Sequence, residues 1–266
     1  MKLHDLVLLE TSTGRTTPLK MDKAIQLAKT TYSNYFKQFE YPVLYRGSSN
    51  YASDMNPILV NPTVGTRRGT DSAFGYTEMI SNLDSWKGLP RRDKSLIMTN
   101  RSRYAKIFGT PVGVVLPNNF TAIGTDKDFW YAYVDKLANI ISLESASLSA
   151  FDRLIQVLFY NPTDLKDMVN KIPEYIESVK SKEFDFHGNA KGLTDALIAH
   201  AGGKEKLSTT SVINFFDILL DPRNNNKINI INSMSDINYK EVWTDATCML
   251  LGDIPYNHIK KTIEAV

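Results

Sequence analysis

Three short segments, far apart in the chain, each carry a polar side chain beside an apolar run. They contain Arg46, then Ser95 and Thr99, then Glu241. An arginine binds phosphate through its forked donors. A hydroxyl can orient a carboxylate, and a fixed carboxylate can stabilise the positive charge that develops on a ribose as its glycosidic bond breaks. If the fold brings them together, these residue types suit cleavage of a nicotinamide–ribose bond.

The elements that must position these residues are predicted to be strands. Pro42 marks a break, and the apolar residues that follow predict a short buried strand ending at Arg46-Gly47. Similar apolar runs predict three further strand regions, at 94–99, 112–116 and 241–251. Each of the polar residues therefore lies on or beside a predicted strand.

Helical spacing dominates the rest of the chain. Residues 22–38 and 72–84 read as helices around a long loop at 48–72, and 255–264 as a final helix with proline in its first turn. The middle of the chain contains mostly helical patterns, at 126–143, 146–159, 163–180, 190–201 and 209–220. We therefore expect an α+β fold, with a core formed by 1–125 and 226–266 and a helical insertion or subdomain at 126–225.

Composition restricts the classes of protein. The chain has 266 residues, of which 42% are hydrophobic, and a formal net charge of +2, so no overall field attracts nucleic acid. Residues 40–110 nevertheless carry seven arginines and three lysines against six acidic residues. We expect a soluble cytoplasmic protein, because no apolar run has membrane-spanning length and Cys248 is the only cysteine. The four histidines are scattered, so we expect no metal site.

The motifs together resemble the arginine–serine–glutamate class of ADP-ribosyltransferases. The resemblance rests on Tyr45-Arg46-Gly47, on the hydroxyl-bearing strand followed by Ala-x-x-Phe-Gly at 105–109, and on the late glutamate, Glu241. It covers roughly 40–117 and 238–251, and 86–99 is similar to phage and bacterial members. It implies a split β-sheet core, NAD as co-substrate and a protein or nucleic-acid acceptor. For a phage-encoded protein it implies action in the host cytoplasm.

The resemblance also implies roles for individual residues. Glu241 would act on the ribose, with Ser95 or Thr99 orienting it. Arg46 would bind the phosphates or the adjoining ribose. The other residues implied in cofactor binding are Gly47, whose lack of a side chain would admit the nicotinamide amide, its neighbour Tyr45, and an aromatic that would stack on nicotinamide, from among Tyr51, Phe74 and Tyr76.

Two departures from the family pattern keep a second hypothesis open. Tyr239 stands where the family often has an acid or glutamine, and no Ser-Thr-Ser string is present. The alternative is a non-catalytic binding or structural protein that keeps the same fold and uses its helical region as an interaction surface. We further expect Trp243 and Cys248 to be buried core residues and Tyr104 to serve in packing.

Overall fold

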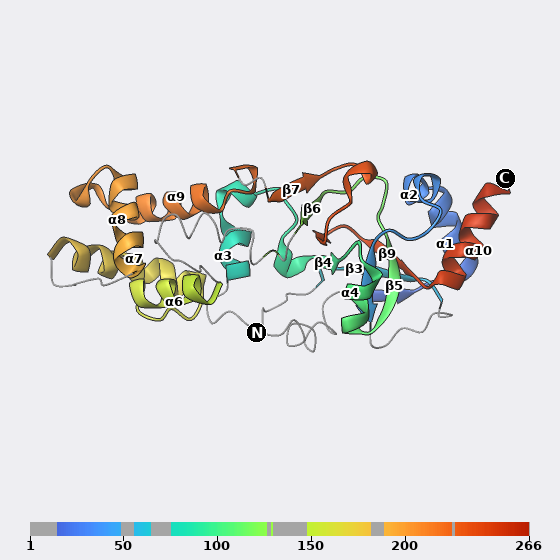
Figure 1. Cartoon of the computed structure of the whole chain (residues 1–266), viewed down its shortest axis with the longest axis horizontal. Helices are drawn as coiled ribbons and strands as arrows, with labels where there is room; N and C mark the ends of the chain where they lie inside the picture. Colours follow the sequence, from blue (N-terminus) through green and yellow to red (C-terminus); the bar gives the residue numbers. More distant parts are fainter. Residues whose placement is uncertain are drawn as a thin grey trace. The chain divides into compact units, whose positions relative to one another are not determined.

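The protein, seen in a computed structural model, divides into two compact units. The structure describes residues 15–48, 56–64, 76–126, 129, 148–181, 189–224 and 227–265 (Figure 1). The first unit comprises Met1–Arg67, Gly88–Lys127 and Ile228–Val266, and the second comprises Arg68–Lys87 and Asp128–Lys227. Of the residues that we predicted to be part of the core, the described residues 76–87 fall in the helical unit of this division.

The first unit contains two antiparallel β-sheets, and with the helices they make the protein α+β, as expected. Sheet A has the strand order β1-β3-β9-β5-β2, and sheet B has the order β4-β8-β6-β7. The strands of sheet A are β1 (Arg15–Pro18), β2 (Tyr45–Ser48), β3 (Ile58–Asn61), β5 (Thr110–Val115) and β9 (Cys248–Leu251). The strands of sheet B are β4 (Leu96–Met98), β6 (Ala122–Thr125), β7 (Ile228–Ile231) and β8 (Glu241–Thr244).

The predicted strand 241–251 and the predicted loop 48–72 both differ from the structure. The run 241–251 is two strands, β8 and β9, which lie in different sheets, so the turn between them carries the chain from sheet B to sheet A. The predicted loop 48–72 contains β3, which pairs with β1 and β9. A continuous apolar run hides such a change of sheet, because every residue of β9 is buried and shows no alternation.

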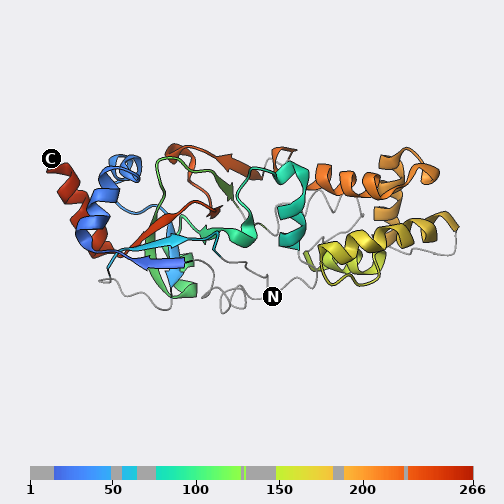
Figure 2. The same ribbon diagram turned by 180° about the vertical axis from the view of Figure 1, so that it is seen from behind.

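Helices cover sheet A. Helix α1 (Met21–Lys29) and helix α10 (Asp253–Glu264) lie side by side, as both views show (Figures 1 and 2). Helix α2 (Ser33–Gln38) is tied to α10 by a bond from Lys260 Nζ to the Phe36 carbonyl at 2.5 Å. The predicted helix 22–38 is interrupted between α1 and α2. The Thr30 hydroxyl bonds back to the Gln26 carbonyl at 3.0 Å, a contact that competes with continued helix.

The second unit is helical in its described part. Its helices are α3 (Tyr76–Asn82), α6 (Leu148–Leu158), α7 (Leu165–Ser181), α8 (Asn189–Ala201) and α9 (Thr209–Leu220). Each lies within a few residues of a predicted helix, and the predicted helix 126–143 lies almost wholly outside the described residues. Ser208 caps α9 in a reciprocal capping box with Ser211. Trp86 donates to the Leu220 carbonyl at 2.9 Å, which anchors the segment after α3 on the end of α9.

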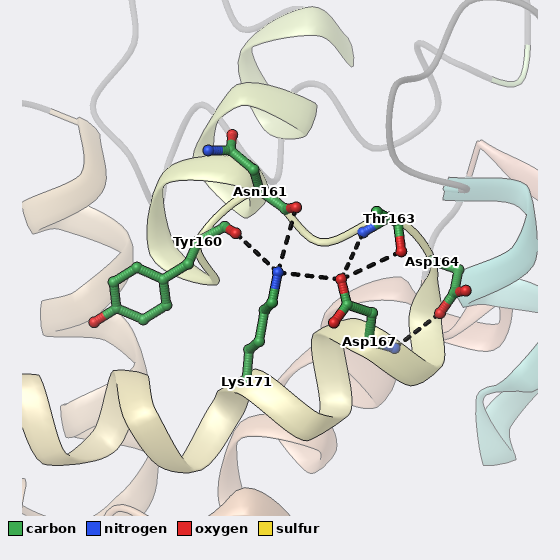
Figure 3. Close-up of polar contacts among 6 residues, drawn as sticks. All are labelled: Tyr160, Asn161, Thr163, Asp164, Asp167 and Lys171. Carbon is green, nitrogen blue, oxygen red and sulfur yellow. Dashed lines mark hydrogen bonds and ion pairs between the residues drawn. The ribbon is translucent and has the colours of Figure 1, made fainter.

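The connection between α6 and α7 is fixed by polar contacts (Figure 3). Tyr160 and Asn161 adopt left-handed backbone angles, with φ of 55° and 53°, so α6 ends there. Lys171 of α7 donates to the Tyr160 carbonyl at 3.0 Å and pairs with Asp167 at 3.1 Å. Asp167 also accepts the Thr163 backbone N–H at 2.9 Å. This network holds the start of α7 against the end of α6.

None of the described helices combines the length and the apolar composition that crossing a membrane requires. In the part of the chain that the structure describes, no three histidine, cysteine or acidic side chains are grouped so that they could hold a metal ion.

Candidate active site at the split between the sheets

In the described part of the first unit, an isolated bridge joins the two sheets. Tyr45 of β2 and Thr99, just after β4, exchange both backbone hydrogen bonds, at 2.8 and 2.9 Å. This bridge is isolated, since no β2–β4 ladder continues from it among the described residues. The strands that carry the predicted arginine, hydroxyls and glutamate are therefore neighbours, in the order β2, β4, β8.

Arg46 spans the point where the sheets separate. Its Nη1 donates to the Ile97 carbonyl of β4 at 2.8 Å. In a continued antiparallel ladder that carbonyl would accept from the backbone of β2. The Arg46 side chain thus takes the place of a backbone donor at the split, and this contact fixes its guanidinium between the two sheets.

Strand register distinguishes the two hydroxyl candidates. In the β4–β8 pair Met98 lies opposite Val242, so extending the register by one residue sets Thr99 opposite Glu241. Ser95 lies four residues earlier, about 13 Å away along an extended strand. Its hydroxyl donates to the Arg91 carbonyl at 2.6 Å, so its single proton is directed away from a carboxylate, which can only accept. The register therefore favours Thr99, and Ser95 does not orient Glu241 in this structure.

Glu241 begins β8 and is held by an arginine that the sequence analysis did not single out. Arg92 donates to Glu241 Oε1 from Nε at 3.3 Å and from Nη2 at 3.0 Å. The two side chains are only 6% and 15% exposed, so the glutamate does not point into bulk water. The Arg92 guanidinium also lies over the ring of Trp243, 5.9 Å from its centroid.

The segment that carries Arg92 is anchored on both sides. Trp243 is fully buried, as expected, and its indole N–H donates to the Pro90 carbonyl at 3.2 Å. Arg91 makes a forked contact with buried Asp93, at 3.0 and 2.8 Å. These contacts fix a short 3₁₀ helix, η4 (Arg92–Lys94), against β8, so Arg92 is presented to Glu241 by a rigid element.

Gly47 has a structural reason to be glycine. A Cβ at this position would lie 2.2 Å from the Ala105 carbonyl oxygen and 2.6 Å from Phe108 Cβ. Helix α4 (Ser102–Ala105) and the 3₁₀ helix η5 (Lys106–Phe108) therefore pack directly on the β2 backbone. Packing by itself is sufficient to require a glycine here, and the approach of a nicotinamide amide stays a prediction.

Of the four aromatic residues predicted to bind NAD, the structure describes the side chain of Tyr45 alone. The Tyr45 hydroxyl donates to the Pro42 carbonyl at 2.5 Å, and burial raises its pKa, with a smaller contribution from the charge of Asp253. Tyr51 and Phe74 lie outside the described residues. Tyr76 begins α3 in the second unit, and only its backbone is described.

Tyr239, the residue that departs from the family pattern, packs against β6. A Cβ on Gly124 would lie 2.4 Å from the Tyr239 ring, so the ring fills the space above that glycine. Burial raises the pKa of Tyr239, and the nearby charges of Asp126 and Asp236 add to this. The side chain therefore serves as a packing group.

Arg92 was missed because Arg91-Arg92-Asp93 reads as a solvated turn before a strand. The usable signal was the position of two arginines and one aspartate directly before a fully apolar strand, where charges that are buried have to be paired.

Searches of protein-family models, of curated proteins and of solved structures found no match to this chain. The site is thus interpreted from its own geometry.

Proposed function

We propose that this protein is an NAD-dependent ADP-ribosyltransferase that transfers ADP-ribose to a macromolecular acceptor and releases nicotinamide. The observation that carries the proposal is the adjacency of β2, β4 and β8, which sets Arg46, Thr99 and Glu241 on three neighbouring strands at one split between sheets. The resemblance of these segments to the arginine–serine–glutamate transferases adds support.

The chemistry would use each group in turn. Arg46, fixed by the Ile97 carbonyl, would bind a phosphate of NAD. As the C1′–N bond breaks, nicotinamide leaves with the bonding electron pair and the ribose becomes an oxocarbenium-like cation. The Glu241 carboxylate would stabilise that cation. An acceptor nucleophile would then bond to C1′ and lose its proton.

Arg92 would keep Glu241 in place for this step. A guanidinium that donates twice to one carboxylate oxygen restrains the orientation of the carboxylate in a site that is only slightly exposed. In this proposal Arg92 shares the orienting role that was predicted for Ser95 or Thr99.

A second candidate is a non-catalytic protein with the same split-sheet core. The observation that favours it is the same ion pair, since a carboxylate already bound to a buried arginine can be purely structural. The two candidates differ in whether NAD is consumed.

Labelled NAD provides the test. The purified protein is incubated with NAD labelled in its adenylate moiety and with a cell lysate, and macromolecules are then separated. We expect labelled macromolecules with the wild type and none with Glu241→Gln. The control is Glu264→Gln, which changes an exposed glutamate on α10. Labelling by Glu241→Gln equal to the wild type would contradict the assignment. Absence of labelling by the wild type, with nicotinamide still bound to ribose, would favour the non-catalytic candidate.

A further inference from the structure

Three cations surround one tyrosine beside the candidate site. The Tyr104 ring centroid lies 5.1 Å from Lys240 Nζ, 5.4 Å from Arg103 Cζ and 5.6 Å from Arg101 Cζ. Arg101 and Arg103 are exposed, and Tyr104 and Lys240 are partly exposed. We call these four residues the basic–aromatic cluster. All of them belong to the first unit.

Carboxylates in the described part of the chain do not neutralise this cluster. Among the described residues, Arg101, Arg103 and Lys240 take part in no ion pair, whereas Arg91 and Arg92 each have an acidic partner. A hydrogen bond from Arg101 and the positive charges of Lys240 and Arg103 lower the pKa of Tyr104, which reports the electropositive surroundings of the ring. Three like charges held this close favour a ligand that carries several negative charges.

The cluster is built from two segments that are fixed to each other. Arg101, Arg103 and Tyr104 lie on or beside α4, and Lys240 directly precedes β8. Asn100 joins the segments, since its backbone N–H donates to the Tyr239 carbonyl at 3.3 Å and its side chain donates to Asn238 at 2.7 Å. The two backbone segments that carry the cluster are therefore fixed relative to each other.

The cluster adjoins the candidate active site through the chain itself. Lys240 is the residue before Glu241, and the Arg101 backbone N–H donates to the Thr99 hydroxyl at 3.2 Å. The cluster and the residues that we assign to NAD cleavage are thus carried by contiguous stretches of backbone.

We propose that the basic–aromatic cluster binds single-stranded nucleic acid and, if the proposed function holds, presents it as the acceptor of ADP-ribose. Phosphates along a strand match several neighbouring cations, and arginine forks suit phosphate oxygens. Exposed bases stack on tyrosine rings and on guanidinium planes, which the carboxylate side chains of an acidic peptide cannot do. The combination of cations with an aromatic ring therefore favours nucleic acid over acidic protein.

Fluorescence anisotropy with a labelled single-stranded RNA of about 12 nucleotides tests the binding without NAD. A site that neutralises three phosphates should lose about 20-fold in affinity between 50 and 200 mM salt. The triple variant Arg101→Gln/Arg103→Gln/Lys240→Gln should lose most of its binding at 50 mM salt and most of this salt dependence. Tyr104→Ala should weaken binding, and Tyr104→Phe, which keeps the ring, should bind as the wild type does.

The matched control removes three positive charges elsewhere in the same unit. Lys29, Lys37 and Lys261 are exposed on α1, α2 and α10, and their triple glutamine variant should bind RNA as the wild type does. If both triple variants weakened RNA binding equally, the loss would follow from the lower net charge of the protein and not from the cluster. That result would overturn the proposal. Three other results would overturn it: unchanged binding by the cluster variant, equal binding of poly-glutamate, or displacement of the RNA by NAD. The last would assign the cluster to the dinucleotide phosphates.

The same assay separates this proposal from the proposed function. Glu241→Gln should bind the RNA with wild-type affinity, because the cluster does not include the carboxylate. Adding labelled NAD should then transfer label to the RNA with the wild type and not with Glu241→Gln. RNA binding without any transfer would overturn the acceptor role and leave the binding site intact. Transfer to lysate macromolecules without RNA binding would overturn the cluster proposal alone.

Discussion

Arg92 donates two hydrogen bonds to a single carboxylate oxygen of Glu241, across 149 positions of sequence. The pair lies beside Trp243 of β8, and only 6% and 15% of the two side chains are exposed. The glutamate that the sequence singles out is therefore an ionic group held in a largely buried setting. Its partner is an arginine on a short 3₁₀ helix, in addition to the predicted choice of Ser95 or Thr99.

Removing one member of this pair should destabilise the first unit. Arg92→Met removes the cation of this ion pair and Glu241→Gln removes its anion. Each should lower the free energy of unfolding by about 3 kcal/mol, because breaking a largely buried ion pair from one side is costly. Urea unfolding, followed by circular dichroism, measures both.

The double variant Arg92→Met/Glu241→Gln is the control for this interpretation. Because it removes both charges of the pair, it should be more stable than the less stable single variant, which gives a large coupling energy in the double-mutant cycle. Additive losses in the double variant would mean that the two side chains act independently, which contradicts the pairing.

Gly47 should tolerate no side chain. In Gly47→Ala the new Cβ would meet the Ala105 carbonyl at 2.2 Å, and backbone cannot move aside cheaply. We expect a loss of about 3 kcal/mol in the free energy of unfolding. Gly88→Ala is the comparison, because Gly88 has φ of 77° but a Cβ added there would meet no atom within 4 Å. Backbone strain alone should cost about 1 kcal/mol there. Equal losses at both positions would refute the steric explanation.

The sequence predicted the helices better than the strands, and the reason is physical. Helical spacing over 163–180 and 209–220 is long and repetitive, so α7 and α9 appear close to their predicted bounds. Strands β1, β3 and β6 have four residues each, too few to establish a pattern. Which sheet a strand joins depends on pairing with distant residues, and local sequence does not encode this.

Prediction of the site was limited in the same way. Arg46 and Glu241 could be named because each stands at the end of an apolar run. The choice between Ser95 and Thr99 required the register of β4 against β8, a relation between strands more than 140 positions apart. The role of Arg92 depends on a side chain that reaches from η4 to β8, for which spacing along the chain gives no signal.

Asp167 should make the second unit sensitive to acid. The Thr163 backbone N–H and the ammonium of Lys171 hold the pKa of Asp167 below its ordinary value. A lowered folded-state pKa contributes stability that is present above the ordinary aspartate pKa of about 4 and lost as the pH falls through the folded-state value. Asp167→Asn should therefore be less stable than the wild type at pH 7, and the difference should shrink as the pH falls below about 4.

Thermal unfolding at a series of pH values measures this difference. Asp195→Asn, which removes a carboxylate from an exposed ion pair on α8, controls for the loss of one negative charge. A difference between Asp167→Asn and the wild type that stayed constant down to pH 2 would show that the carboxylate charge is not what stabilises the α6–α7 connection.

Cys248 should be unreactive toward thiol reagents in the folded protein. The side chain is fully buried at the start of β9, and burial, with a smaller effect of the Asp245 charge, raises the pKa of its thiol. Because the thiolate is the reactive form, a thiol reagent at pH 8 should modify the native protein only as fast as the protein unfolds. In denaturant the same reagent should react with the thiol at once. Rapid stoichiometric labelling of the native protein would contradict the position of β9 in the core.

Release of nicotinamide from NAD tests the central claim most directly, because it requires no knowledge of the acceptor. Nicotinamide is quantified by chromatography after incubation of NAD with the wild type, with Glu241→Gln and with Glu264→Gln, each shown to be folded under the assay conditions. We predict that the wild type and Glu264→Gln release nicotinamide at the same rate and that Glu241→Gln is slower by about 100-fold or more. Release by Glu241→Gln at the wild-type rate, or no release by the wild type, would contradict the assignment of this site to NAD cleavage.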